Sequence, residues 1–381
     1  MAAAGACARL MPSAGSVQQN KIVFCSYHGA GYGCNPKYVT EALLEHSSLD
    51  LDLVWLTKKQ DPSIPARVRQ VRYGTPKAAF ELATAKVWVD NSRVRRYVRK
   101  KPDQFYLQTW HGCLSPKRLE ADIEPFLSKA YIKGAKQDSQ DADLLICNND
   151  FFEGVMRNSF WYEGPILRCG LPRNAPLITP NEELRRRVRA SLGMSDKVGL
   201  CLYAPTFRDN GDNSVFHFDY ARCCEALKKR FGKDFVFALR LHPVVAQTGI
   251  GKGAGLFDLS SYSDPIELLC AADVCITDYS SMAEDFALLG RPGYLYMPDA
   301  EQFSTSRGGL YYPHDVRPYP AAYTEDELIA RIFSTPDEEF KVRREAFFDM
   351  VGLCDDGKGA QQVAEILEHV VAGKTLPFLN S

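Results

Sequence analysis

The chain has 381 residues, of which 45% are apolar and 24% are charged, and its 46 Lys and Arg nearly balance its 47 Asp and Glu. This composition excludes a disordered chain, which needs low hydrophobicity and a large net charge, and a collagen, which needs a glycine period. The formal net charge of -1 argues against a dedicated nucleic-acid-binding protein.

The length predicts two domains, at about 100 to 200 residues per domain. The twelve cysteines lie scattered without a C-x-x-C pair, which is typical of a protein from a reducing compartment. Residues 1–20 lack the apolar core of a signal peptide, so we expect a disordered leader there. No stretch approaches the roughly 18 to 20 apolar residues of a membrane span. We therefore expect a cytoplasmic protein that meets a membrane only at its surface.

Short apolar runs alternate with helical stretches in two successive series. The first series has strands at 21–27, 51–56, 86–91, 104–110 and 143–149, with helices at 36–46, 75–84 and 121–136. The second follows a polar helix at 181–192 and has strands at 198–206, 234–243, 256–260, 272–278 and 292–299, with helices at 219–231, 264–271 and 281–289. Strands that alternate with helices predict parallel sheets. The predicted fold class is therefore α/β, with two Rossmann-like doubly wound domains.

We place the first domain at 21–172 and the second at 173–325, with the Pro-containing segment 170–176 as the linker. The amphipathic segment 326–381 is expected to form C-terminal helices that pack back across both domains. In doubly wound sheets, ligands bind beyond the carboxyl ends of the strands. The polar residues that follow each predicted strand are therefore the candidates for a functional site.

The first candidate is His111, which ends the run Gln108-Thr109-Trp110-His111 and precedes a glycine. An imidazole suits general base catalysis because its unperturbed pKa lies near neutral pH. Lys117 and Arg118, just downstream, could neutralise a phosphate near that imidazole. A histidine that is satisfied by backbone groups in a tight turn is the alternative for this motif taken alone.

The second candidate is the pair Arg240 and His242, which project from one face of the predicted strand 234–243. A guanidinium beside an imidazole can cradle phosphate oxygens. A buried ion pair of Arg240 is the alternative.

The third candidate is a polar cluster that follows the strand 272–278. Ser281 and Glu284 have the spacing of a capping box for the next helix. Backbone N–H groups at a helix start, together with serine hydroxyls, bind phosphate without a metal. A cap that only satisfies the helix is the alternative, but it leaves other members of the cluster without a role. The cluster comprises Thr277, Asp278, Ser280, Ser281, Glu284 and Asp285.

Two further loops give weaker signals. Thr206 and Arg208 follow the strand 198–206 and could contact a nucleotide or phosphate. The glycine-rich segment 27–37 lacks the spacing of a dinucleotide-binding fingerprint and of a P-loop, so its glycines are expected to make room for an acceptor.

Together these motifs resemble the CDP-glycerol glycerophosphotransferase family of teichoic acid and capsule polymer synthesis, from about residue 21 to 365. The resemblance implies a GT-B fold, in which two Rossmann-like domains face a central cleft. It makes 21–172 the acceptor-side domain and 173–325 the CDP-donor-binding domain. The motifs, in the order of the family, are N-P-K-Y at 35–38, V-D-N at 89–91, Q-T-W-H-G at 108–112, G-L-P-R-N at 170–174, Y-A-P-T-F-R at 203–208, R-L-H-P at 240–243 and T-D-Y-S-S at 277–281.

The same resemblance implies roles for the candidate residues. His111 corresponds to the base that accepts the proton of an attacking hydroxyl, and Arg240 with His242 to the pair that meets the pyrophosphate. Thr277, Ser280 and Ser281 correspond to positions beside the phosphates, whereas Asp278, Glu284 and Asp285 have the ribose as one possible partner. The expected substrates are CDP-glycerol and a lipid-linked saccharide or polyol-phosphate acceptor, and CMP is the expected product. We expect no cofactor and little dependence on a metal.

Several alternatives stay open at this point. The donor could be CDP-ribitol, and the enzyme could add one unit or many. A GT-B sugar-nucleotide glycosyltransferase or epimerase shares the architecture, and a binding module without turnover is a third class.

A basic run at 93–101 has six cations in nine positions. It could attract anionic lipids or a polyphosphate acceptor, or it could be a solvated helix face. A second basic run, at 185–189, makes the first less distinctive. Because the acceptor of the family is lipid-linked, we expect peripheral attachment to the inner face of the plasma membrane.

Overall fold

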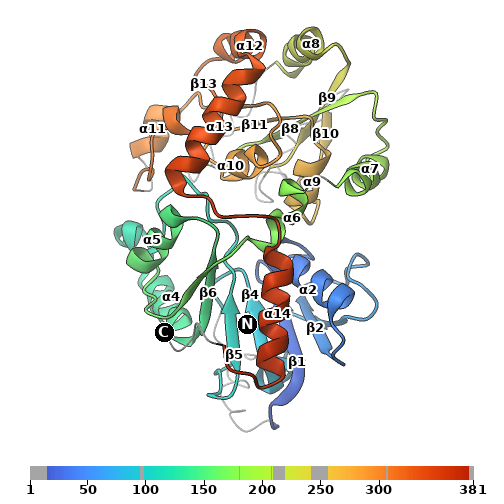
Figure 1. Ribbon diagram of the computed structural model, residues 1–381. Coiled ribbons are helices and arrows are strands. Elements are labelled where there is room, and N and C mark those ends of the chain that lie inside the picture. The colour runs from blue at the N-terminus through green and yellow to red at the C-terminus, as the bar shows by residue number, and fades with distance from the viewer. Residues whose placement is uncertain are drawn as a thin grey trace. The chain divides into compact units, whose positions relative to one another are not determined.

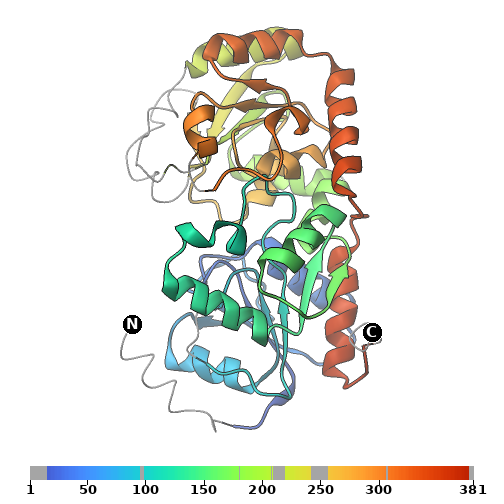
Figure 2. The same cartoon turned by 90° about the vertical axis from the view of Figure 1, so that its left-hand side faces the viewer.

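The computed structural model describes residues 15–94, 98–179, 181–206, 208, 219–241, 256–305 and 308–376. These residues form two compact units. Figure 1 labels most of their elements, and Figure 2 shows the same chain from a second side. Unit 1 contains the described residues up to Cys113, Leu119–Ala175 and those from Leu353 onward. Unit 2 contains Leu114–Arg118 and Pro176–Gly352. The boundary at Ala175 therefore falls inside the segment 170–176 that the sequence indicated as a linker.

Unit 1 is built on a seven-stranded sheet with the order β3-β2-β1-β4-β5-β6-β7, and all of its strand pairs are parallel. In the register of the sheet, Ile22 pairs with Leu53 on one side and with Val87 on the other. Near-continuous apolar runs are typical of parallel strands that are covered on both faces. The strands are β1 (Gln18–Cys25), β2 (Asp52–Thr57), β3 (Arg69–Arg72), β4 (Ala85–Asp90), β5 (Phe105–Gln108), β6 (Leu144–Cys147) and β7 (Ile166–Arg168).

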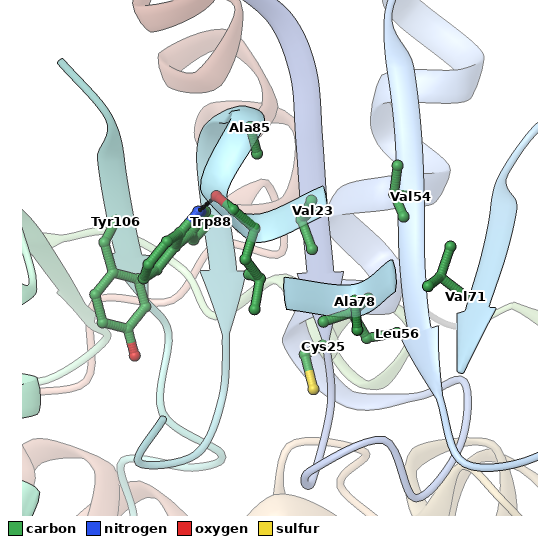
Figure 3. Packing of buried hydrophobic residues seen from close by; sticks show 10 residues of the cluster. Val23, Cys25, Val54, Leu56, Val71, Ala78, Ala85, Trp88 and Tyr106 are labelled. Atoms are coloured by element: carbon green, nitrogen blue, oxygen red, sulfur yellow. Dashed lines mark hydrogen bonds between the residues drawn. The ribbon is translucent and has the colours of Figure 1, made fainter. Parts of the chain in front are cut away.

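The core of unit 1 lies on both faces of this sheet. Figure 3 shows one face, where Val23 and Cys25 of β1 lie with Trp88 of β4 and with side chains of β2, β3, β5 and α3. The indole Nε1 of Trp88 donates to the carbonyl of Leu82 at 2.8 Å, so the buried ring keeps no unmet donor. Phe24 points to the opposite face, because side chains alternate along a strand, and its ring is stacked 6.1 Å from that of Trp55.

Three helices of unit 1 begin where a polar side chain caps them. Thr75, Ser128 and Asn149 each accept a hydrogen bond from a backbone N–H in the first turn of α3, α4 and α5. Among the described residues, no helix has both the length and the apolar character that a membrane span requires. The helices are α2 (Cys34–His46), α3 (Pro76–Thr84), η1 (Glu120–Phe126), α4 (Lys129–Asp141), α5 (Asp150–Ser159), η2 (Pro172–Asn174) and α14 (Gly359–Val371), and α6 (Ala175–Ile178) spans the boundary of the units.

The prediction of one helix over 121–136 is wrong. Residues 120–126 form the 3₁₀ helix η1, which contains Pro125, and α4 starts afresh at Lys129. Proline has no N–H for a helical hydrogen bond, and the Ser128 hydroxyl accepts from Tyr131 N at 3.2 Å, which starts the second helix.

Unit 2 has a six-stranded sheet with the order β10-β9-β8-β11-β12-β13, again parallel throughout. Its strands are β8 (Gly199–Ala204), β9 (Phe235–Leu239), β10 (Leu256–Asp258), β11 (Val274–Thr277), β12 (Gly293–Tyr296) and β13 (Ala321–Ala322). Its helices are α7 (Glu182–Ser191), α8 (Tyr220–Phe231), α9 (Pro265–Ala271), α10 (Met282–Ala287), α11 (Ala300–Thr305), η5 (His314–Val316), α12 (Glu325–Ser334) and α13 (Asp337–Val351). The predicted α/β class with two doubly wound parallel sheets is confirmed.

The C-terminal segment returns to unit 1 after α13, and Asp355 anchors it. The Asp355 carboxylate accepts hydrogen bonds from Asn148 Nδ2 at 3.0 Å, Leu171 N at 3.0 Å and Asn174 Nδ2 at 2.9 Å. These bonds hold the segment against the buried residues of η2, which are therefore part of the packed unit.

Candidate active site

In each sheet the strand order reverses at one point, and the polar candidates gather there. In unit 1 the reversal lies between β1 and β4, and in unit 2 it lies between β8 and β11. Open α/β sheets bind ligands at such a switch point, outside the carboxyl ends of the strands. His111 follows β5, the neighbour of β4, whereas Thr206 follows β8 and Asp278 follows β11.

His111 is held at the end of β4 through its imidazole ring. The Nδ1 atom lies 2.9 Å from the carbonyl oxygen of Asn91. Because a carbonyl oxygen only accepts, Nδ1 carries the proton, and in the neutral ring the basic lone pair is on Nε2. The ring stacks on Trp110 at 4.3 Å, and the ring of Tyr27, which follows β1, lies 5.8 Å away. A half-buried imidazole with a fixed tautomer is suited to accept a proton through Nε2.

The backbone around His111 adopts unusual conformations. Trp110 has φ +52 and Gly112 has φ +148, both in the region that L side chains rarely adopt. The amide oxygen Oε1 of Gln108 accepts from Trp110 N at 2.9 Å. A Cβ atom on Gly112 would lie 3.0 Å from Nη2 of Arg173, so glycine also makes room for that buried guanidinium. We name residues 109–112 the His111 turn.

Arg93, the first residue of the basic run, is an internal cation. Its guanidinium is buried and lies 2.9 Å from Glu120 and 3.3 Å from Asp138. It also lies 5.6 Å from the centre of the Trp110 ring. Desolvation opposes its charge, but the two carboxylates outweigh it, and the pKa of Arg93 is raised. None of the three interpretations of the run, as a lipid contact, an acceptor contact or a solvated helix face, therefore applies to Arg93.

Other cations of the two basic runs also have internal partners. Lys100 lies 2.9 Å from Asp143, whereas residues 95–97 are outside the described part of the chain. In the second run, Arg185 lies 2.8 Å from Asp273, and the buried Arg189 donates to the carbonyl of Ala271 at 3.0 Å.

The switch point of unit 2 is cross-linked by Asp278. Its carboxylate accepts from the backbone N of Thr206 at 2.8 Å and lies 2.9 Å from Nη1 of Arg208. The Arg208 guanidinium also forms two bonds to Asp299, at 2.7 and 3.0 Å, and faces the ring of Tyr279. Thr206, Arg208 and Asp278 are all buried. Phe207 and Asp209, their neighbours in the motif, lie outside the described residues.

The loop of residues 277–281, which we name the Asp278 loop, is tied to the inside of unit 2. The Thr277 hydroxyl donates to the carbonyl of Ala204 at 2.6 Å. Arg317 donates from Nη1 to the carbonyl of Asp278 at 2.6 Å and from Nη2 to the carbonyl of Ser280 at 3.1 Å. One guanidinium therefore fixes two carbonyls of the loop.

The predicted capping box of Ser281 and Glu284 is wrong. Ser281 makes no side-chain cap bond to α10, and Glu284 Oε1 instead lies 2.6 Å from Nε of Arg317, with both side chains fully buried. Burial raises the pKa of Glu284, although the Arg317 guanidinium opposes that rise. A buried arginine needs a carboxylate partner, because a buried charge without a partner is costly. Glu284 therefore pairs with Arg317 and does not cap the helix. Asp285 is also buried, in the first turn of α10.

The remaining candidates belong to unit 2 or lie outside the described residues. Arg240 follows β9, and its Nη1 donates to the carbonyls of Leu259 at 3.2 Å and Tyr262 at 2.7 Å. His242 lies outside the described residues. Lys117 forms a backbone bridge with Leu310 and so belongs to unit 2, although it is close to His111 in the sequence. No group of three or more metal-ligating side chains was found among the described residues.

Several residues that shape these loops had no role in the sequence interpretation. Asn35, Asn91 and Arg173 stand in the motifs N-P-K-Y, V-D-N and G-L-P-R-N, so the motifs marked them without showing what they contact. Arg317 and Asp299 lie far from their partners in the chain, and no local pattern points to them.

Two doubly wound parallel sheets, each with polar residues at its switch point, have the architecture of the GT-B fold. The solved structure of the wall teichoic acid polymerase TagF superposes on this chain with a TM-score of 0.85 at 26% identity, over 97% of this chain and 93% of that one. A variant of the same polymerase soaked with CDPG gives a TM-score of 0.84 at 26% identity, over 97% of this chain and 93% of that one.

Sequence relatives agree with this class. The teichoic acid poly(glycerol phosphate) polymerase of Bacillus spizizenii is 30% identical over 362 residues, which are 91% of each chain. The protein of the same name in Bacillus subtilis is 30% identical over 93% of this chain but only 49% of its own length. The teichoic acid ribitol-phosphate primase of Bacillus spizizenii is 29% identical over 95% of this chain and 94% of its own.

The family model of CDP-glycerol:poly(glycerophosphate) glycerophosphotransferases matches residues 8–369. The chain therefore belongs to this family of enzymes, as its motifs indicated.

Proposed function

We propose that this enzyme transfers glycerol phosphate from CDP-glycerol to a hydroxyl of a lipid-linked or polymeric acceptor and releases CMP. The observation that carries the proposal is the hydrogen bond of His111 Nδ1 to the carbonyl of Asn91, which leaves Nε2 as the basic atom. The family, the glycerol-phosphate polymerases among its relatives and the CDPG soak of TagF support this donor.

In the proposed reaction, the acceptor hydroxyl attacks the phosphorus on the glycerol side of the diphosphate. The new O–P bond forms as the bond to the bridging oxygen of CMP breaks, and the hydroxyl proton passes to Nε2 of His111. General base catalysis of this kind contributes about 100- to 10,000-fold to a rate. Cations and hydrogen-bond donors aimed at the leaving phosphate stabilise its developing charge. We assign that task to Arg240, to His242 and to the hydroxyls of Ser280 and Ser281.

The internal contacts of unit 2 divide the candidate residues into two groups. Thr277, Asp278 and Glu284 are fully buried and bonded to their own unit, so we assign them to the framework of the Asp278 loop. Ser280 and Ser281 are only partly buried, and Ser281 makes no cap bond to α10. These two hydroxyls are the members of the loop that we expect to contact the donor.

A donor panel tests the proposal. The protein is incubated with CDP-glycerol, CDP-ribitol or a UDP-sugar and a short synthetic lipid acceptor, and the released nucleotide is measured. We expect CMP release from CDP-glycerol with the acceptor present. UDP release alone, or donor binding without turnover, would contradict the proposal.

The second candidate is the same reaction with CDP-ribitol, which the likeness to a ribitol-phosphate primase favours. CMP release from CDP-ribitol at a higher kcat/KM than from CDP-glycerol would select it. The mass of the acceptor product separates two modes of action, because one added unit marks a primase and a ladder of masses marks a polymerase.

We also propose that unit 1 contacts an anionic membrane surface. Phe126 is 64% exposed at the end of η1, and Lys129 and Lys133 are exposed in the adjoining α4. An exposed aromatic ring beside lysines favours binding to anionic lipid headgroups. Flotation with vesicles that contain anionic lipid should fall in high salt and in Lys129→Glu/Lys133→Glu, whereas flotation that ignores both changes would exclude this surface.

A further inference from the structure

Asn35 links helix α2 to the His111 turn. It is the second residue of α2, and its side chain is fully buried. Its amide nitrogen Nδ2 donates to the carbonyl of Thr109 at 3.3 Å and to the carbonyl of Trp110 at 3.0 Å. The two amide hydrogens therefore hold the two peptide groups that flank Trp110.

Trp110, the residue between those carbonyls, has a strained backbone conformation. Trp110 has φ +52, and a left-handed backbone costs a residue with a Cβ atom about 1–2 kcal/mol. Such a conformation persists only when the surrounding structure fixes it. Trp110 also supplies the ring on which His111 stacks, so the conformation of this one residue sets the direction of the imidazole.

The oxygen of the Asn35 amide holds Arg173, which packs against the His111 turn. Its oxygen Oδ1 accepts from the backbone N of Arg173 at 3.0 Å. The guanidinium of Arg173 in turn lies against Gly112, the residue after His111. Asn35 thus connects Trp110, the residue before His111, with Arg173, which packs against Gly112, the residue after it.

We propose that Asn35 is a positioning residue for the proposed base. It acts through the His111 turn, by holding the Trp110 backbone so that the His111 ring meets the carbonyl of Asn91. This inference rests on the proposed function, because it assumes that His111 takes the proton. Both hydrogens and the oxygen of the amide are used, so an aspartate of the same shape cannot replace it: a carboxylate would face two carbonyl oxygens without a hydrogen to donate.

A double-mutant cycle tests the role. The variants Asn35→Ala, Asn35→Asp, His111→Ala and Asn35→Ala/His111→Ala are assayed for CMP release with CDP-glycerol and acceptor. Misplacement of a catalytic group by about 1 Å costs on the order of 100-fold, so Asn35→Ala should lower kcat by about 10- to 100-fold, while KM for CDP-glycerol changes by less than about threefold. In the His111→Ala background the same substitution should change kcat by less than about threefold, because coupled residues are not additive.

The matched control is Asn148→Ala, which removes a buried amide of unit 1 that donates to Asp355 rather than to the turn. It should lower the urea midpoint without the loss in kcat. If Asn35→Ala does not fold, Asn35→Asp, which has nearly the same volume, takes its place in the cycle together with Asn35→Asp/His111→Ala. Equal loss of kcat with and without His111, or unchanged kcat in both Asn35 variants, would overturn the positioning role. Absence of CMP release by the wild-type enzyme would instead overturn the proposed function.

Discussion

The His111 turn follows β5, one strand beyond the switch point of unit 1, whereas the Asp278 loop follows β11, at the switch point of unit 2. Different chemistry holds the two segments. The backbone of the His111 turn is bonded by the neutral amides of Asn35 and Gln108. The Asp278 loop is bonded by the buried cation of Arg317, which is paired with Glu284.

The difference predicts different consequences of substitution. The loss of a neutral amide costs about 0.5–1.5 kcal/mol of stability for each internal hydrogen bond that it makes. A buried ion that loses its partner costs about 3–5 kcal/mol. We therefore expect changes at the His111 turn to act mainly on the rate, and changes beneath the Asp278 loop to act mainly on stability.

The largest expected effect on stability is that of Arg317→Met. The substitution leaves the carboxylate of Glu284 buried without its cation and should cost about 3–5 kcal/mol. The double variant Arg317→Met/Glu284→Leu removes both charges and should recover much of that loss. Urea unfolding, followed at several wavelengths, measures the shift in midpoint.

The control for this prediction is Arg187→Met. Arg187 lies 3.1 Å from Glu267, but its side chain is 68% exposed. An exposed pair contributes about 0–1 kcal/mol, so the midpoint should hardly move. Equal shifts of the urea midpoint for Arg187→Met and Arg317→Met would show that the buried pair beneath the Asp278 loop contributes no more to stability than an exposed pair does.

A smaller effect on stability, joined to a large effect on rate, is expected for Gly112→Ala. The φ of +148 strains an alanine, and its Cβ would press on Arg173. Gly74→Ala is the matched control, because Gly74 has φ +74 and a Cβ there meets nothing within 4 Å. Strain of this kind costs on the order of 1–3 kcal/mol. Both variants should unfold more easily, but only Gly112→Ala should lose CMP release.

The smallest expected effect concerns pH. Burial, with the charge of Arg317 nearby, lowers the pKa of His314 below 6.5. A base with a depressed folded-state pKa is protonated first in the unfolded chain, so stability is complete above pH 6.5 and falls as the pH drops below it. His314→Gln should flatten the dependence of Tm on pH between 7.5 and 5.5. His46→Gln, at a side chain that is 55% exposed, should leave it unchanged. If Tm of the His314→Gln variant still fell with pH as steeply as that of the wild-type protein, His314 would be excluded as the source of this pH dependence.

The strands of both sheets could be predicted from the sequence because their apolar runs are long. The edge strands β3, β7 and β13, of four, three and two residues, were missed because none of them lies in a long apolar run of the sequence. The segment 121–136 was predicted as one helix from its pattern of polar and apolar residues. Pro125 and the cap at Ser128 instead divide it into the 3₁₀ helix η1 and the start of α4.

The site could be predicted only as far as local motifs reach. The position of His111 after a strand follows from the sequence, whereas its bond to Asn91 depends on the pairing of β4 with β5. The spacing of Ser281 and Glu284 suggested a cap because the sequence does not show that Arg317, more than thirty residues later, takes the carboxylate. Contacts of this range are set by topology, which no short motif encodes.

The most direct test of the account is the rate of CMP release by His111→Ala with saturating CDP-glycerol and acceptor. If His111 is the general base, the rate should fall by about 100- to 10,000-fold relative to the wild-type enzyme, with an unchanged urea midpoint. A folded His111→Ala enzyme that releases CMP at a near-normal rate would contradict the assignment of the base.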